Sequence, residues 1–267
     1  MWRIGLAPDA DGQVALDVPR LAELQALLVE ASAEGSPCRA LVLTSAADGV
    51  FCRGMDLQKV IDAPAEERQA GVDAYVQTLL ALRRARPAVI CVVDGEAMGG
   101  GVGLAAASDL VLATQRASFG LPEVVLGLMP AMVLPFLCER LAPQKARWLA
   151  MSGGSLDAAR AHGLGLVDEV CEDAAAAERA CRRALKRLLR AEPRAVGNVR
   201  AFTASLPGMT LEEAAKAGGG RTTADLERAS TRDAVRAFLG GELPPWFDRL
   251  PASPAASAQS EQREETS

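Results

Sequence analysis

The sequence predicts an α/β fold whose sheets are covered by helices and followed by a helical region. In the first half of the chain, short apolar runs with β-branched residues alternate with helical patterns. In the second half, helical patterns dominate. The chain has 267 residues, of which 49% are hydrophobic and 24% charged, so it can bury a sizeable globular core.

The first half contains the elements that predict the α/β core. Residues 18–33 carry apolar side chains at helical spacing, and residues 64–86 form a second amphipathic pattern that opens with proline and acids. Residues 39–45, 88–94 and 109–114 are short apolar runs typical of buried strands. Strands that alternate with helices in this way favour a sheet covered on its faces.

The second half changes character. Most segments between residues 134 and 238 have helical patterns, and only residues 165–170 resemble a strand. The last segment is small, polar and proline-containing, which predicts disorder. We therefore expect an α/β core at residues 1–190, a helical region at 191–250 and a disordered tail at 251–267.

Composition excludes several classes of function. The net charge of −5 provides no basic excess for a phosphate backbone, so we expect no nucleic-acid partner. No apolar run approaches about 20 residues and no export signal is visible, so we expect no membrane partner. The six cysteines form no CxxC pair, which indicates reduced thiols and a cytoplasmic location. A single histidine, His162, nearly excludes histidine-based triads and multi-histidine metal sites.

A glycine cluster follows the second predicted strand. Gly99, Gly100, Gly101 and Gly103 would let the backbone come close to a ligand, and an alanine-rich helix follows them. Backbone N–H groups at a helix start favour negative charge, so this segment could stabilise an oxyanion. Residues 101–106 also match a dinucleotide-binding variant, but the distance from the strand and the missing acid disfavour it. The other alternative is that the glycines only permit tight helix packing.

Four segments in order resemble the crotonase (enoyl-CoA hydratase/isomerase) superfamily. They are FCRGMDL at 51–57, DGEAMGGGVGLAAASDLVLA at 94–113, ASFGLPEVVLGLMP at 117–130 and LDAARAHGLGLVDEV at 156–170. The similarity covers roughly residues 15–250. It implies a crotonase-type spiral of ββα units and a C-terminal helical trimerisation region that builds homotrimers or dimers of trimers.

The resemblance also implies a site. An oxyanion hole would be formed by the backbone N–H groups of Met55 and Gly100, and Glu123 would be the catalytic acid–base residue. An acyl thioester on CoA or on acyl-carrier phosphopantetheine would be the substrate, with no other cofactor and no metal. The implied substrate-binding residues are Met55, Asp56, Leu57, Gln58 and Gly100.

The sequence departs from the family pattern at one catalytic position. Hydratases of the family use two glutamates, and the first falls on Gly103 here. One carboxylate must then move the proton alone, in a dehydratase or an isomerase. The segment around residues 130–146 resembles the dehydratases of polyketide β-branching cassettes, which also carry glycine at this position. That resemblance implies dehydration of 3-hydroxy-3-methylglutaryl-ACP to 3-methylglutaconyl-ACP. The alternatives are a Δ3,Δ2-enoyl-CoA isomerase and a catalytically inactive scaffold.

Several residues have a structural and a functional interpretation. Glu123 follows Pro122 and could simply favour a helix dipole, but the family motif favours catalysis, and the apolar neighbours at 121 and 124–126 would raise its pKa. Asp56 is typical of a helix cap and Asp109 of a structural acid. The arginine-rich segment 179–190 is typical of a solvated helix face, with docking of an acidic carrier protein or a nucleotide phosphate as the functional alternative. The N-terminus is too short for the hairpin usual in the family, so the first strand is expected to be lost or shortened.

Overall fold

The computed structural model describes residues 1–9 and 12–247. The chain forms two compact units. Unit 1 contains Met1–Arg183 and Pro193–Ser205, and unit 2 contains Ala184–Glu192 and the chain from Leu206 onward. The boundary expected near residue 190 stays a prediction. The predicted disordered tail lies outside the described residues.

Unit 1 is built on two small sheets. The first has five parallel strands in the order β1-β2-β4-β6-β9, namely β1 (Trp2–Leu6), β2 (Ala40–Ser45), β4 (Ala88–Val93), β6 (Leu110–Thr114) and β9 (Glu169–Cys171). The second has the order β3-β5-β7-β8, with β3 (Val50–Cys52), β5 (Glu96–Met98), β7 (Ser118–Gly120) and β8 (Ser155–Asp157). Its pairs are parallel except the antiparallel β7–β8 pair.

The chain visits the two sheets in turn and then forms a helix, which produces a spiral of ββα units. The helices of this unit are α1 (Val18–Ser32), α2 (Leu57–Asp62), α3 (Ala65–Arg84), α4 (Gly100–Ala107), α5 (Leu134–Arg140), α6 (Pro143–Ser152), α7 (Ala158–Leu164) and α9 (Pro193–Ser205). A short 3-10 helix, η1 (Pro122–Leu126), follows β7. This arrangement confirms the predicted fold class.

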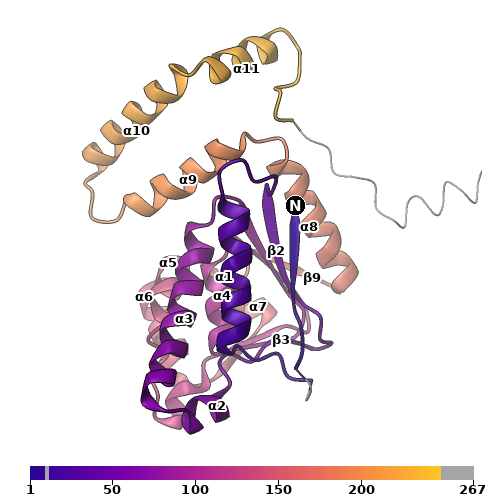
Figure 1. The fold of residues 1–267 in the computed structure, drawn as a ribbon, viewed down its shortest axis with the longest axis vertical. Coiled ribbons are helices and arrows are strands. Elements are labelled where there is room, and N and C mark those ends of the chain that lie inside the picture. Colours follow the sequence, from indigo (N-terminus) through magenta and orange to yellow (C-terminus); the bar gives the residue numbers. More distant parts are fainter. Residues whose placement is uncertain (10–11, 248–267) are drawn as a thin grey trace, which may run out of the picture. The chain divides into compact units, whose positions relative to one another are not determined.

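The long helices α1 and α3 cover the first sheet, and the short helix α4 runs through the core. Helices α1 and α3 lie side by side (Figure 1). Asp17 caps α1, because its carboxylate accepts a hydrogen bond from the backbone N–H of Arg20 at 3.1 Å. Every residue of α4 is buried, which suits its glycine- and alanine-rich sequence. The start of α4 is therefore held in place by packing on all sides.

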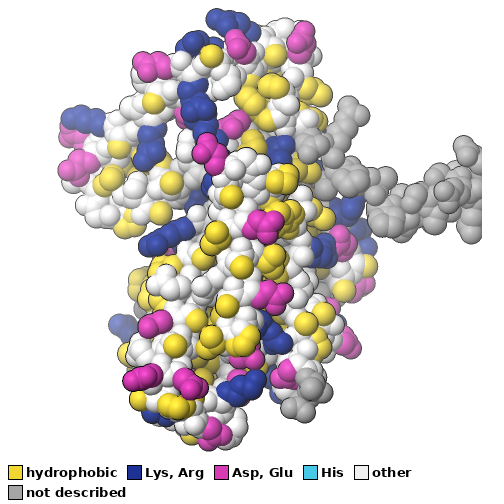
Figure 2. Space-filling view, in the orientation of Figure 1, with side chains coloured by type: hydrophobic (Ala, Val, Ile, Leu, Met, Phe, Trp, Pro, Cys, Tyr) yellow, Lys and Arg dark blue, Asp and Glu magenta, His cyan; other side chains and the backbone are white. Residues whose placement is uncertain are grey.

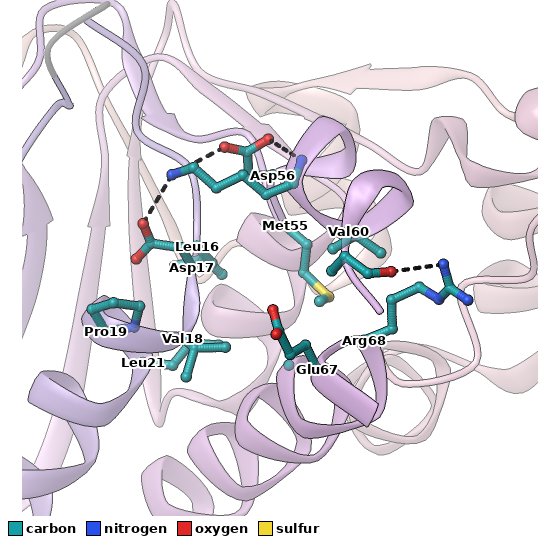
Figure 3. Close-up of a pocket in the computed structure, with 13 residues that line it drawn as sticks. Leu16, Asp17, Val18, Pro19, Leu21, Met55, Asp56, Val60, Glu67 and Arg68 are labelled. Carbon is teal, nitrogen blue, oxygen red and sulfur yellow. Dashed lines mark hydrogen bonds and ion pairs between the residues drawn. The ribbon is translucent and has the colours of Figure 1, made fainter. Parts of the chain in front are cut away.

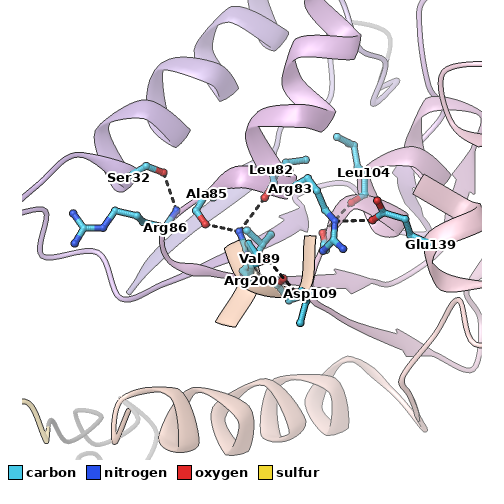
Figure 4. A network of polar contacts seen from close by, with 12 residues as sticks. Ser32, Leu82, Arg83, Ala85, Arg86, Val89, Leu104, Asp109, Glu139 and Arg200 are labelled. Carbon is cyan, nitrogen blue, oxygen red and sulfur yellow. Dashed lines mark hydrogen bonds and ion pairs between the residues drawn. The ribbon is translucent and has the colours of Figure 1, made fainter. Parts of the chain in front are cut away.

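Arg200 ties α9 to the rest of unit 1 (Figure 4). Its guanidinium donates to the carbonyl oxygens of Leu82 and Ala85 and forms an ion pair with Asp109. The Asp109 carboxylate also accepts a hydrogen bond from the backbone N–H of Val89 at 2.7 Å. These contacts place Asp109 in a structural role, as the sequence predicts.

Unit 2 consists of helices in its described part. It contains the last residues of α8 (Ala174–Leu188), together with α10 (Leu211–Leu226) and α11 (Ala229–Leu239). Thr210 and Glu213 form a capping box at the start of α10, which satisfies backbone N–H groups that the helix leaves free. The helical character predicted for this region is confirmed.

The sequence prediction was wrong about strands in the second half. Strand β8 lies in a segment for which a helix is predicted, and β9 begins only at Glu169, four residues later than expected. All four strands of the second sheet have three residues, too few to show an alternating pattern. At the N-terminus, β1 is an edge strand paired with β2. The expected shortening relative to the family stays a prediction.

The charge distribution on the surface and the character of the helices both bear on the partners expected from the sequence. On the face shown in Figure 2, acidic and basic side chains are interspersed among apolar ones, with no extended basic patch. Within residues 1–9 and 12–247, no helix combines the length and apolar character needed to cross a bilayer.

Candidate active site

Two glycine-containing segments cross at the centre of unit 1. Gly54, just after β3, has a φ of +83°, and a Cβ atom there would lie 2.7 Å from the backbone nitrogen of Gly100. A Cβ atom on Gly101 would lie 2.3 Å from the carbonyl oxygen of Cys52. Only glycine permits so close an approach. The crossing brings the chain after β3 against the first turn of α4.

This crossing leaves two backbone N–H groups without acceptors. Neither Met55 nor Gly100 donates its backbone N–H to any described residue. The Gly100 group belongs to the first turn of α4, where N–H groups lack helical partners and the dipole favours negative charge. Both residues line a cavity of about 260 Å³. Free donors of this kind can stabilise an oxyanion that enters the cavity.

Glu123 lies in η1 and lines the same cavity. Its Oε1 atom lies 3.0 Å from where a Cβ atom on Gly99 would be. Its Oε2 atom is buried and has no hydrogen-bond partner among the described residues. Burial raises the pKa of Glu123 above the ordinary value of 4.5, and a hydrogen bond with its own backbone opposes this shift. Among the described residues lining the cavity, Glu123 is the only carboxylate.

The apolar surroundings of Glu123 differ from the predicted ones. Of the expected neighbours, only Leu126 lines the cavity, whereas Leu121 is fully buried in the core and Val125 is 74% exposed. The expected rise in the pKa of Glu123 is found, but only Leu126 faces the cavity with it, because side chains three residues apart align in a 3-10 turn. The cavity wall is instead completed by Val72 of α3 and by Leu128, Met129, Met132 and Val133.

Sequence reasoning missed Tyr75, which also lines this cavity. It is fully buried on α3, and its hydroxyl donates to the carbonyl oxygen of Gly100 at 2.7 Å. It is the only tyrosine of a chain with 4% aromatic residues. That rarity was the one signal that could have drawn attention to it.

A second cavity of about 360 Å³ lies beside α2, and Met55 and Val60 line both cavities (Figure 3). At its rim, the Lys59 ammonium lies 3.2 Å from Asp17 and 3.3 Å from Asp56. Hydrogen bonds with these two carboxylates raise the pKa of Lys59. The rim therefore combines a fixed cation with two acids.

The predicted substrate-binding residues separate into three groups. Met55, Leu57 and Gly100 line the cavity of Glu123, whereas Asp56 lines the second cavity. Asp56 also caps α2, as predicted, by accepting from the backbone N–H of Lys59 at 3.1 Å. Gln58 lines neither cavity, and its amide donates to Asp62 at 2.7 Å.

Other groups with possible chemistry lie elsewhere. The Nδ1 atom of His162, in the last turn of α7, lies 2.8 Å from the carbonyl oxygen of Val167. Five of the six cysteines are buried and all six are free thiols, with Cys138 exposed. The part of the chain that the structure describes holds no cluster of three or more residues suited to a metal ion.

Comparison with known proteins identifies the family. The model of the enoyl-CoA hydratase/isomerase family matches residues 13–249. The chain therefore belongs to this family of enzymes. Its fold matches that of AtuE from Pseudomonas aeruginosa, with a TM-score of 0.83 and 30% identity over 92% of this chain and 97% of that one.

Two curated relatives differ in their reactions. The bacillaene synthase dehydratase PksH of Bacillus subtilis is 34% identical over 114 residues, which is 43% of each chain. That alignment spans less than half the length of PksH. The 1,2-epoxyphenylacetyl-CoA isomerase of Escherichia coli is 33% identical over 193 residues, or 68% of this chain and 70% of that protein.

Proposed function

We propose that this chain is an acyl-thioester dehydratase in which Glu123 works as the only carboxylate. One observation carries the proposal: a single half-buried carboxylate, whose Oε2 atom is buried, shares a cavity with two backbone N–H groups that have no acceptor among the described residues. An acyl thioester that places its carbonyl oxygen on Met55 and Gly100 would present its α-carbon to the cavity that Glu123 lines.

The reaction follows from this arrangement. The Glu123 carboxylate removes the α-proton, and the electrons of the broken C–H bond form an enolate whose oxygen is stabilised by the two N–H groups. The enolate then collapses to a carbon–carbon double bond and expels the β-hydroxyl group. Protonated Glu123 returns the proton to the departing hydroxyl, so one water molecule leaves and the carboxylate is restored. The raised pKa of Glu123 suits a group that must both take and return a proton.

For the substrate we propose 3-hydroxy-3-methylglutaryl on an acyl carrier protein, with 3-methylglutaconyl-ACP as product. Similarity to the dehydratase PksH supports dehydration, and the resemblance of residues 130–146 to the dehydratases of polyketide β-branching cassettes supports this substrate. So does Arg53, the only cation among the described residues that line the cavity, because the glutaryl group ends in a carboxylate. The apolar walls suit its methyl group. We further propose a homotrimer or dimer of trimers, as the family resemblance implies.

An isomerase is the second candidate. A lone carboxylate can take a proton from the α-carbon of a 3-enoyl thioester and return it to the γ-carbon, which moves the double bond without water. Glu123 is the single carboxylate among the described residues of the cavity, and this favours isomerisation as much as dehydration. The similarity to an isomerase over two thirds of the chain supports it.

Incubation with defined thioesters separates these functions. We expect loss of water from 3-hydroxy-3-methylglutaryl-ACP by mass spectrometry, faster than from the CoA thioester. Glu123→Gln should lower the rate by about 10³-fold or more, because it removes the proton acceptor. Glu66→Gln, which changes an exposed glutamate of α3, is the matched control and should leave the rate unchanged. Isomerisation of 3-hexenoyl-CoA, with no loss of water from either 3-hydroxy-3-methylglutaryl thioester, would establish the second candidate. Inactivity towards all three thioesters would indicate a scaffold.

The role of Arg53 has its own test. Arg53→Ala should raise KM for the 3-hydroxy-3-methylglutaryl thioester about tenfold or more, since a charged hydrogen bond to the distal carboxylate is lost. KM for 3-hydroxybutyryl thioester, which lacks that carboxylate, should change little. Equal effects on the two substrates would contradict the proposed substrate.

A further inference from the structure

The position of the missing glutamate is not empty space. A Cβ atom on Gly103 would lie 2.1 Å from the hydroxyl oxygen of Tyr75 and 3.2 Å from a methyl group of Val133. The first of these distances is far below van der Waals contact. Tyr75 therefore occupies the volume into which any side chain at residue 103 would extend.

The hydroxyl of Tyr75 also has a defined partner. It donates to the carbonyl oxygen of Gly100 at 2.7 Å, and its ring lies 3.3 Å from where a Cβ atom on Gly100 would be. Gly100 supplies one of the two free N–H groups of the cavity. Ring and hydroxyl thus hold the residue on which one end of the oxyanion hole depends.

The ionisation state of this hydroxyl is set by its surroundings. Burial raises the pKa of Tyr75 well above 10.0, and the nearby Cys52 and Glu123 act in the same direction. The phenol is therefore neutral throughout the physiological range and remains a hydrogen-bond donor. It fills the place of an acid without supplying a second base.

We infer that Tyr75 is the specificity-determining and positioning residue that makes this a one-carboxylate site, because it fills the place of the second acid and holds Gly100. This inference rests on the proposed function for its effect on rate, but its geometric part can be tested by stability alone. A conventional two-acid site would need both a larger residue at 103 and a smaller one at 75. The glycine and the tyrosine are thus one coupled feature.

A double-mutant cycle tests the geometry. Gly103→Ala should lower Tm by several degrees in the wild-type background, because the new methyl group meets the Tyr75 hydroxyl. In a Tyr75→Phe background the oxygen is gone and the nearest ring carbon lies 3.3 Å away, so most of that loss should disappear. An equal loss in both backgrounds would overturn the inference. This test requires no substrate.

Kinetics tests the hold on Gly100. Exchange of the α-proton of 3-hydroxy-3-methylglutaryl-ACP in D₂O should slow about fivefold in Tyr75→Phe, with KM nearly unchanged, since one hydrogen bond that positions the oxyanion hole is lost. A merely structural tyrosine would alter Tm and leave this kcat unchanged, and that result would overturn the inference. Wild-type protein that exchanges no faster than Glu123→Gln would instead overturn the proposed function, with the stability cycle still deciding the geometry.

The strongest consequence is a gain of function. Tyr75→Ala with Gly103→Glu should accommodate a second carboxylate and hydrate 2-butenoyl-CoA at least tenfold faster than Tyr75→Ala alone. Gly103→Glu alone should be unstable or inactive. If the folded double variant hydrates no faster than Tyr75→Ala, the claim that Tyr75 takes the place of the second acid is wrong.

Discussion

The two walls of the cavity are built in opposite ways. On one side, Glu123 lies in a single 3-10 turn whose neighbours Val125 and Leu126 are 74% and 59% exposed. On the other side, Gly100 begins helix α4, every residue of which is buried, and Tyr75 of α3 is fully buried in the core of unit 1. The reacting group thus sits on a lightly packed segment, whereas the groups that position the substrate belong to the core. Changes to the first wall should alter mainly the chemistry, and changes to the second should lower stability by a larger amount as well.

The largest effect is expected at the glycine crossing of the buried wall. Gly101→Ala places a methyl group 2.3 Å from the carbonyl oxygen of Cys52, and neither backbone can move without disturbing α4. We expect the free energy of unfolding to fall by about 3 kcal/mol and the enzymatic activity to be lost. Urea denaturation followed by circular dichroism would measure the loss.

Gly163→Ala is the matched control for that prediction. Gly163 is an exposed residue of α7, and nothing lies within 4 Å of the position its Cβ atom would take. Alanine there should stabilise the protein by about 0.5 kcal/mol, because it favours the helix over the unfolded chain. If Gly101→Ala proved as harmless as Gly163→Ala, the close approach of β3 and α4 would be contradicted.

The same contrast explains what the sequence could predict. The long helices α1 and α3 and the strands β2, β4 and β6 of the first sheet have at least five residues each, so their positions follow from the pattern alone. The three-residue strands of the second sheet do not. Glu123 was predicted from its motif. Of the apolar neighbours that were named, only Leu126 shares its cavity, because side chains three residues apart align in a 3-10 turn and the motif does not reveal that turn.

Tyr75 shows a second kind of limit. Its position on α3 is consistent with a core residue of an amphipathic helix, and nothing local relates it to Gly103, which is 28 residues away in the sequence. The contact depends on how α3 packs against α4, which is a tertiary fact. An absent side chain is visible in the sequence, but the group that replaces it is visible only in the structure.

For the wall formed by the 3-10 turn of Glu123, the exposed wall, we predict a specific pH dependence of the rate. Glu123 must be ionised to remove a proton, and its pKa is raised by burial above 4.5. On the acidic side of that raised pKa, kcat/KM should fall about tenfold for each pH unit, with the inflection above the value of a solvated glutamate. A pH–rate profile for exchange of the α-proton would measure it. An inflection at or below 4.5 would show that the cavity does not desolvate the carboxylate.

An effect on stability smaller than that of Gly101→Ala is expected at the same residue, Glu123. A buried oxygen without a partner is costly when the carboxylate is ionised, so Glu123→Gln should raise the free energy of unfolding by about 1 kcal/mol at neutral pH. Because the folded pKa is raised, the wild-type carboxyl stabilises the folded state most when protonated and loses this contribution as pH rises through the folded pKa. The advantage of glutamine should therefore shrink on acidification and vanish below the ordinary value of 4.5.

Denaturation of both proteins across this pH range would measure the difference, with Glu66→Gln as the exposed counterpart that should show no such dependence. Stabilisation that stays constant with pH would mean that the gain comes from packing and not from the removal of a desolvated charge. The expected outcome would show that the ionised Glu123 carboxylate itself lowers the free energy of unfolding. That effect is separate from the packing that holds Tyr75 and Gly100 in the core.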